Sequence, residues 1–391
     1  MKKTLANGVT LVGHVSNESG FEVSLTFGGG HQTEEKLGLA AVYENIVSRQ
    51  ARGELQAVYG GNITSFTTAG TNSQLGKKLN ELWLACVHPT IDDYEVELAT
   101  SDIVQHTYDL AGVPMRQCKL AYKHTAFGQD KVVWDTDEYI KKVSALKADD
   151  VQAYIDKALV GKNIILSFVG SELGFAKFEK LATKLFGNLP AGEKTPLKNY
   201  LYTGGYQEIP GNGMLNVAMF GWDVSRSGNF AETNVLMSML SARLERALAP
   251  LSVAAEIKIA GYFGYRTLRI CVSCICQDNF AKAIDIVCEN VRRATYDDAS
   301  DRRLETSKQR AMSERLAISN EALPHSVQAA WLLLKRGIEY DNNKCIANIW
   351  RTTAEDVRDK ALDIFTSEMT CVIYGNYHST KEELLRKMQL A

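Results

Sequence analysis

The alternation of apolar and polar residues predicts strands at the edges of each half of the chain and helices between them. Residues 21–28 and 215–221 read as strands that end in glycine, and each is followed by a loop and a long stretch of helical periodicity. Apolar residues also recur at helical spacing over residues 75–87 and 302–318. Each half therefore predicts an α+β fold.

The closing segments of the two halves repeat the same order of elements. Asp150 and Asp356 each open a helical pattern that leads into a buried strand, and these strands end at Gly170 and Gly375. The two aspartates are 206 positions apart and the two glycines 205, so the segments keep register to one residue. The repeat predicts two homologous domains, each a mostly antiparallel sheet packed with several helices.

A stretch rich in turn-forming residues separates the halves. Three prolines and six glycines lie between residues 187 and 213. We therefore expect one domain at residues 1–190, a linker at 191–213 and a second domain at 214–391.

The composition adds little about the fold, but it argues against several classes of binding partner. The 391 residues are 45% apolar and 23% charged, and 44 Lys and Arg against 46 Asp and Glu leave a net charge of -2. A surface that binds nucleic acid or anionic lipid needs clustered excess positive charge, so neither partner is expected. No apolar run approaches the ~18 residues of a membrane span, and the charged start has no apolar core behind it. We expect a cytoplasmic protein.

The eight cysteines are scattered, which favours free thiols in a reducing compartment. The tightest group lies in the β-prone run at residues 268–276. Residues an odd number apart in a strand face opposite ways, so Cys271 and Cys274 cannot share a zinc ion. We interpret these cysteines as structural.

The residues with chemical potential lie on a helix near the N-terminus, predicted to begin near residues 33–36. Its apolar residues form one stripe at helical spacing, made by Leu39, Val42, Tyr43 and Ile46. Ala41, Glu44 and Asn45 fall on a different face. Just before the helix, His31, Glu34 and Glu35 could be read as a displaced metal motif, but acidic residues are favoured at a helix start, and we interpret them so.

Here the chain resembles the insulinase, or pitrilysin, family, which includes the mitochondrial processing peptidases. Members open with an Asn-Gly strand and then a Gly-Leu-Ala-His-Phe-Leu-Glu-His helix, which carries the inverted zinc motif His-x-x-Glu-His. This chain keeps Asn7-Gly8, Gly38-Leu39-Ala40 and Glu44, but Ala41 and Asn45 stand where the family has its histidines. The resemblance thus implies the family fold without the two imidazoles that would bind zinc.

The third zinc ligand of the family is a glutamate on a helix that ends before a proline. By similarity that helix contains residues 103–107 ahead of Pro114, which puts Gln105 or His106 at the glutamate position. The resemblance therefore implies no catalytic or metal-binding residue in this chain. One alternative is an active peptidase with another ligand set, such as His106 with Glu44, although a zinc site needs at least three convergent ligands.

Two further segments imply substrate-binding positions. One is similar to the family's Gly-Gly-x-x-Asn-Ala-x-Thr strand and places Gly60, Gly61 and Thr64 there. The other is similar to Gly-Gly-Gly-x-Ser-Ser-Arg-Leu and places Ser241 and Arg243 there, although bulkier residues replace its glycines. The Arg and Tyr that follow in active members are absent.

The resemblance implies a noncatalytic subunit of a heterodimeric insulinase-like zinc peptidase. Such a chain is a half-chamber that helps enclose and position an extended precursor or leader peptide. It binds no cofactor itself, and a catalytic partner subunit with an intact His-x-x-Glu-His motif supplies the zinc. The alternative is a scaffold protein of the same fold with no role in proteolysis, as the core subunits of the respiratory cytochrome bc complex illustrate within the family.

Overall fold

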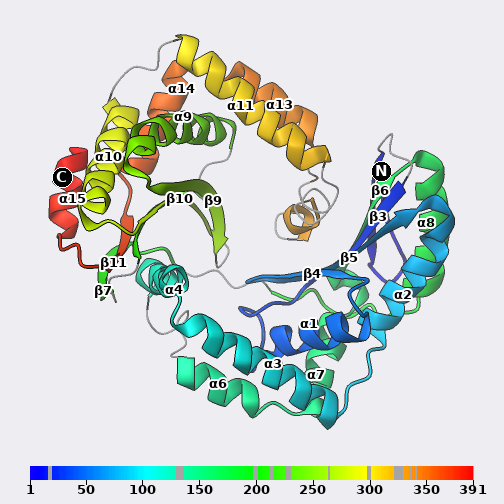
Figure 1. Cartoon of the computed structure of the whole chain (residues 1–391). Helices are drawn as coiled ribbons and strands as arrows, with labels where there is room; N and C mark the ends of the chain where they lie inside the picture. The colour runs from blue at the N-terminus through cyan, green and yellow to red at the C-terminus, as the bar shows by residue number, and fades with distance from the viewer. Residues whose placement is uncertain are drawn as a thin grey trace. The chain divides into compact units, whose positions relative to one another are not determined.

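The chain forms two compact units, neither of which is one continuous stretch of sequence (Figure 1). Unit 1 comprises Met1–Tyr108, Asp135–Lys198 and Ala317–Tyr340, and unit 2 comprises Asp109–Trp134, Asn199–Leu316 and Asp341–Ala391. The structure is a computed structural model, and it describes residues 1–15, 20–128, 136–196, 201–211, 215–224, 230–262, 265–296, 301–320, 329–334, 337, 339 and 341–390.

Unit 1 is a six-stranded sheet packed with helices. Its strands are β1 (Lys2–Thr4), β2 (Thr10–Val15), β3 (Gly20–Gly28), β4 (Gln56–Tyr59), β5 (Ile63–Thr71) and β6 (Ile164–Gly170). Its helices are α1 (Leu39–Gln50), α2 (Leu75–Val87), α3 (Asp93–Ala111, whose last residues pass into unit 2), α6 (Thr136–Ser144), α7 (Ala148–Ala158) and α8 (Glu172–Phe186). The strands lie in the order β1-β2-β6-β3-β5-β4, with only β2 and β6 parallel.

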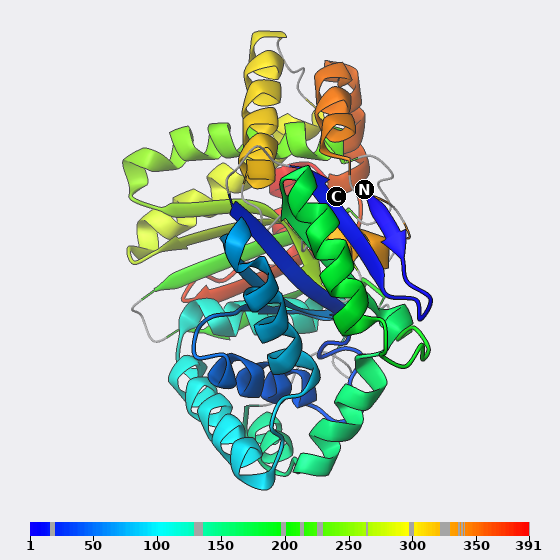
Figure 2. The same ribbon diagram turned by 90° about the vertical axis from the view of Figure 1, so that its right-hand side faces the viewer.

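One face of this sheet forms the main apolar core of unit 1. Side chains of α1, α2, α7 and α8 bury it, and Figure 2 shows α8 lying over the strands. The Tyr43 ring of α1 meets Phe27 of β3 at 6.0 Å and Phe66 of β5 at 5.7 Å, both edge to face. These contacts fix α1 against the centre of the sheet.

Unit 2 is a five-stranded sheet with its own helices. Its strands are β7 (Gly205–Pro210), β8 (Asn216–Asp223), β9 (Ala254–Tyr262), β10 (Tyr265–Cys274) and β11 (Met369–Gly375). Its helices are α4 (Pro114–Phe127), α9 (Ala231–Leu248), α10 (Gln277–Tyr296), α11 (Asp301–Asn320, whose last residues pass into unit 1), α13 (Asn342–Arg351), α14 (Ala354–Phe365) and α15 (Lys381–Met388). The order is β7-β11-β8-β10-β9, with only β7 and β11 parallel.

The two sheets share one topology once β1 is set aside. The closing strands of the sequence repeat, β6 and β11, occupy equivalent places: each is parallel to one neighbour (β2 or β7) and antiparallel to the other (β3 or β8). Both strands are buried along their whole length. The predicted α+β fold, with two mostly antiparallel sheets packed with helices, is confirmed.

The second face of each sheet is covered by a segment from the other half of the sequence. In unit 2 this segment is α4, which lies beside β7 and β11 (Figure 1). A Cβ at Gly221 of β8 would lie 1.8 Å from the Tyr122 hydroxyl of α4, so only glycine fits this contact. In unit 1, Ala330 and Leu334 pack against the sheet.

The predicted linker at residues 191–213 is not loop throughout. Gly205–Pro210 forms β7, which pairs with β11. The strand stands at the edge of its sheet, where a proline without an N–H group is tolerated, so the Pro- and Gly-rich composition does not prevent pairing.

The cysteines behave as the strand pattern predicts. All eight are free, and Cys271 and Cys274 of β10 belong to different apolar clusters on the two faces of the sheet. Over the described residues, no helix combines the length and the apolar character needed to cross a bilayer.

Candidate functional site

The candidate site is built on α1, which begins later than predicted. The prediction of a helix start near residues 33–36 is wrong: α1 begins at Leu39, after Gly38 in a left-handed conformation at φ 95°. The Glu34 carboxylate, 8% exposed, accepts hydrogen bonds from the N–H groups of Gly38 at 2.8 Å and Ala40 at 2.9 Å. The chain turns before the helix, and this turn lets the Glu34 carboxylate accept hydrogen bonds from the N–H groups at the start of α1.

The apolar stripe predicted for this helix is confirmed. Each of its four residues is at most 3% exposed: Leu39, Val42, Tyr43 and Ile46. Tyr43 also donates a hydrogen bond of 2.7 Å to the Cys86 carbonyl of α2. The helix is thus held by its cap, by aromatic contacts and by a buried hydrogen bond.

The positions of the degenerate zinc motif lie on α1 but do not make a metal site. Ala41 is buried and has no donor atom, and Glu44 and Asn45 are half-buried. The Ser48 hydroxyl donates to Glu44 Oε1 at 2.8 Å. Burial raises the pKa of Glu44, although the hydrogen bond from Ser48 opposes the shift. Asn45 Oδ1 is buried without a hydrogen-bond partner in the described structure.

The third motif position adds no ligand. Gln105 and His106 are both exposed on α3, which an ion pair of 3.8 Å between Arg49 and Asp102 links to α1. Nowhere in the described ranges do three His, Cys, Asp or Glu side chains converge in a way that could hold a metal ion. The residues present do not fit the zinc site of the family, so no reaction step can be derived through a metal here.

The glycine turn predicted for substrate binding connects the edge strand β4 to the loop before α1. The carbonyls of Gly60 and Gly61 accept hydrogen bonds from the N–H groups of His31 at 3.2 Å and Gln32 at 2.7 Å. Thr64 is fully buried, and its hydroxyl donates to the backbone of the same loop at 2.7 Å. These three residues therefore hold the turn in place, and β4 is left at the end of the sheet.

The sequence reasoning missed Gln32, which lies at this turn. Gln32 is 3% exposed, and neither polar atom of its amide has a hydrogen-bond partner within the described part of the chain. Its side chain fills the space beside Gly61, where a Cβ would come within 2.5 Å of it. Nothing in the sequence signals this residue, because only the meeting of two loops buries it.

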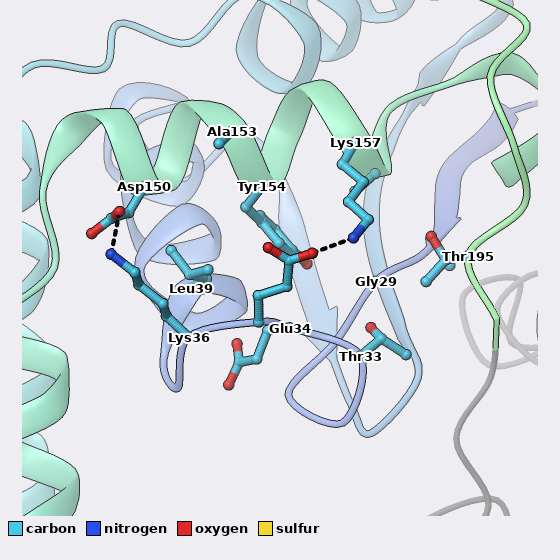
Figure 3. Close-up of a pocket in the computed structure, with 13 residues that line it drawn as sticks. Gly29, Thr33, Glu34, Lys36, Leu39, Asp150, Ala153, Tyr154, Lys157 and Thr195 are labelled. Carbon is cyan, nitrogen blue, oxygen red and sulfur yellow. Dashed lines mark hydrogen bonds and ion pairs between the residues drawn. The ribbon is translucent and has the colours of Figure 1, made fainter.

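A cavity of about 100 Å³ lies beside the start of α1 (Figure 3). Leu39 and Tyr154 contribute apolar surface to its lining. At its rim Lys36 pairs with Asp150 at 2.5 Å, and Lys157 pairs with Glu35. Burial raises the pKa of Tyr154, which disfavours its ionisation. Since Glu34 is also engaged as the helix cap, we assign no acid–base role to this cavity.

The two predicted positions of the second half lie on α9 in unit 2. Ser241 and Arg243 are both half-buried. Arg243 lines a larger cavity of unit 2. Helix α9 ends in the short turn Ala249–Leu251, in the stretch where active family members carry the Arg-Gly-Leu-Ala-Tyr segment.

The chain has a two-unit α+β fold, and its helix α1, which resembles the zinc-motif helix of the insulinase family, holds other residues at the ligand positions. Known structures support the fold. A chain of complex III2 from Candida albicans, solved with Inz-5 bound, superimposes with a TM-score of 0.83 at 14% identity, covering 100% of this chain and 99% of that one. A protease from Helicobacter pylori gives a TM-score of 0.80 at 14% identity, covering 96% of this chain and 99% of that one.

The comparisons of sequence, unlike those of structure, found no match. No protein-family model matches the chain, and no curated protein matches it. The insulinase-like fold predicted from the motif order is nevertheless confirmed, since both structures share it over nearly their whole lengths.

Proposed function

We propose that this chain is the noncatalytic subunit of a heterodimeric insulinase-like zinc peptidase. It helps enclose and position an extended precursor or leader peptide. Both subunits bind this peptide, and a partner subunit with an intact His-x-x-Glu-His motif cleaves it with its zinc ion. The chain binds no cofactor and is not an enzyme on its own. We place the pair in the cytoplasm, where thiols stay reduced.

The retained helix α1 carries this proposal. In the family this helix bears the zinc ligands. Here the Glu34 cap and the buried apolar side hold the same helix in place. Yet Ala41 and Asn45 replace the two histidines, and Glu44 is hydrogen-bonded to Ser48. A glutamate without a metal-activated water has no proton to abstract. Retention of the framework with loss of the chemistry is what we expect of a subunit that shapes a peptide site.

The edge strand β4 supports a peptide-binding role. An edge strand offers unpaired N–H and C=O groups, to which an extended peptide can add as a further strand. The turn at Gly60 and Gly61, fixed with Thr64, holds the end of this strand in place. In our proposal the peptide pairs with β4 of unit 1. For Ser241 and Arg243 of unit 2, a peptide contact remains a prediction from the resemblance.

The proposal is tested with the full chain, alone and co-expressed with a partner that carries the intact zinc motif. We expect no stoichiometric zinc and no cleavage of leader peptides by the chain alone, a one-to-one pair by size exclusion with light scattering, and cleavage by the pair well above that of the partner alone. Stoichiometric zinc and cleavage without a partner would overturn the proposal, and so would a partner that cleaves equally well alone.

A second experiment tests the edge strand. Val58 of β4 is 41% exposed, and a lysine on an edge strand obstructs strand addition. We expect Val58→Lys to raise the KM of the pair for peptide severalfold with little change in kcat. The matched control is Leu173→Lys, at a residue of α8 that is 86% exposed, which should leave both constants unchanged. Equal effects of the two variants contradict peptide pairing at β4.

A scaffold without a role in proteolysis is the second candidate. It is favoured by the likeness to a chain of complex III2, an assembly whose name implies no peptidase, and by the bulky residues that replace the glycines before Ser241. This candidate predicts a stable complex with other proteins and no effect on any peptidase. Co-purification followed by cleavage assays separates the two.

A further inference from the structure

An unexplained feature of unit 2 is a cavity of about 620 Å³ between α9, α10 and α11. This volume lies within the range of small-molecule sites. The described residues that line it are Met239, Ala242, Arg243, Arg246, Ala247, Asn290, Arg293, Arg303, Thr306 and Ser307. Along each helix the lining residues recur at steps of three or four positions, so each helix turns one continuous face toward the cavity.

Four of the described lining residues are arginines, and none of the described ones is acidic. Two described acidic residues next to lining residues in the sequence are engaged elsewhere: Glu245 pairs with Arg310 at 2.7 Å, and Glu305 pairs with Lys308 at 3.0 Å. Arg246 and Arg303 are exposed, and neither has a carboxylate at ion-pair distance in the described part of unit 2. Arg246 and Arg303 therefore bring positive charge to the cavity with which no described carboxylate pairs.

Arg293 shares a carboxylate with a neighbouring arginine. It donates to Glu289 at 2.7 Å, and Glu289 also accepts from Arg292 at 2.8 Å. The hydrogen bonds from Arg292 and Arg293 hold the pKa of Glu289 at about 2, so it stays ionised. A single carboxylate shared by two guanidinium groups leaves excess positive charge on this side too.

The rest of the lining suits a polar anion. Asn290 and Ser307 are buried at 8% and 5% exposure, and Thr306 adds a second hydroxyl. Guanidinium groups bind phosphate oxygens in a bidentate fork, and four of them can contact several phosphate groups at once. A single carboxylate supplies one charge, which is too little for this site. A nucleic-acid backbone is also a poor match, because the site is a concave pocket on a chain of net charge -2.

We propose that this cavity binds a small oligophosphate anion, held by Arg243, Arg246, Arg293 and Arg303. The inference goes beyond the proposed peptidase role and does not depend on it.

The experiment is calorimetric titration of the full chain with inorganic triphosphate at about 150 mM NaCl. We expect saturable one-to-one binding that weakens as salt rises. ATP should bind at least as tightly if a nucleoside triphosphate is the natural source, and more weakly if the source is inorganic. Citrate, a tricarboxylate, should bind at least about tenfold more weakly, since it lacks the phosphate geometry that the forks require. Citrate binding as tight as triphosphate overturns the assignment.

Matched variants locate the site. Arg246→Ala with Arg303→Ala should weaken triphosphate binding by about 100-fold, because each removes a charge-assisted contact. The control is Arg351→Ala with Arg386→Ala, which removes the same charge from exposed positions of unit 2. Replacing Arg246 and Arg303 with lysine should cost about tenfold, since the charge stays and the fork is lost.

Three results overturn the proposal: no saturable binding by the wild-type chain, unchanged binding after the Arg246/Arg303 changes, or equal loss in the Arg351/Arg386 control. Thermal unfolding of each variant verifies that the fold is intact. If both lysine and alanine variants unfold, protection of the wild-type helices by triphosphate in hydrogen exchange decides, and protection that avoids α9 and α11 refutes the site.

Discussion

The Glu34→Gln substitution tests whether one carboxylate holds the helix that carries the degenerate motif. Both oxygens of Glu34 accept backbone hydrogen bonds, from Gly38 at 2.8 Å and from Ala40 at 2.9 Å. Glutamine has the same shape but offers one acceptor oxygen and one NH2 group. One of the two N–H groups at the start of α1 then faces a donor instead of an acceptor.

The magnitude follows from these two contacts. A hydrogen bond to a charged group contributes about 1.5–3 kcal/mol. The loss of a negative charge at the N-terminus of a helix costs about 0.3–1 kcal/mol more. The relief of burying a charged group offsets part of this sum, because Glu34 is only 8% exposed. We expect Glu34→Gln to destabilise α1 by about 2 kcal/mol.

Hydrogen exchange measured on peptides that span α1 is the assay, since it reports the opening of one element in a chain with two units. A loss of 2 kcal/mol corresponds to about 30-fold faster exchange. The control is Glu35→Gln, the neighbouring residue, whose side chain is 74% exposed and pairs with Lys157 at the surface. An exposed pair contributes about 0.2–1 kcal/mol, so the control should accelerate exchange by no more than about fivefold.

The reasoning fails if Glu34→Gln and Glu35→Gln accelerate exchange equally. It also fails if the acceleration in Glu34→Gln appears throughout unit 1 and is no larger in α1, because the cap would then have no specific role at the helix start.

Three further predictions concern backbone strain and buried charge. Gly38→Ala should lower the stability of unit 1 by about 2–4 kcal/mol in urea unfolding, because φ is +95° and the new Cβ would lie 2.6 Å from Val143. The control Gly53→Ala, at φ +79° with open space around it, should cost about 1–2 kcal/mol, and equal costs would contradict the overlap. The pKa of Glu44 is raised by burial, so the folded state binds its proton more tightly and loses stability as pH rises above 4.5; Glu44→Gln should raise Tm at pH 7, and the gain should vanish toward pH 4.5. The pKa of Lys123 is lowered from 10.5 to about 8, first by burial and then by three neighbouring cations. Lys123→Met should therefore stabilise unit 2 at pH 7, and this gain should shrink as pH rises from 8 to 10.5. A gain that is independent of pH would refute the buried charge.

The repeat in the sequence anticipated much of the fold because strands and amphipathic helices leave local patterns. The buried strand predicted to end at Gly375 is β11, and the helix predicted at 75–87 is α2. The spacing of the two repeat ends also matched the sheets, since β6 and β11 occupy equivalent positions. These features depend on which residues face the core, and that can be read from side-chain periodicity.

The start of α1 and the strand β7 could not be read in the same way. Helical periodicity does not show that Glu34 folds back on N–H groups four and six residues later. Glycine and proline composition does not show that Gly205–Pro210 pairs at a sheet edge. Both depend on partners that the chain brings together only after it folds.

The sequence by itself determined the α+β class, the repeated halves, the free cysteines and the missing imidazoles at Ala41 and Asn45, because each is a matter of residue type or local spacing. Only the tertiary structure decided which segment covers which sheet. Helix α4 of the first half packs in unit 2, and residues 329–334 of the second half pack in unit 1. It also gathered four arginines from three helices around one cavity. Contacts between residues more than a hundred positions apart leave no periodic trace in one sequence, since they depend on packing and not on local conformation.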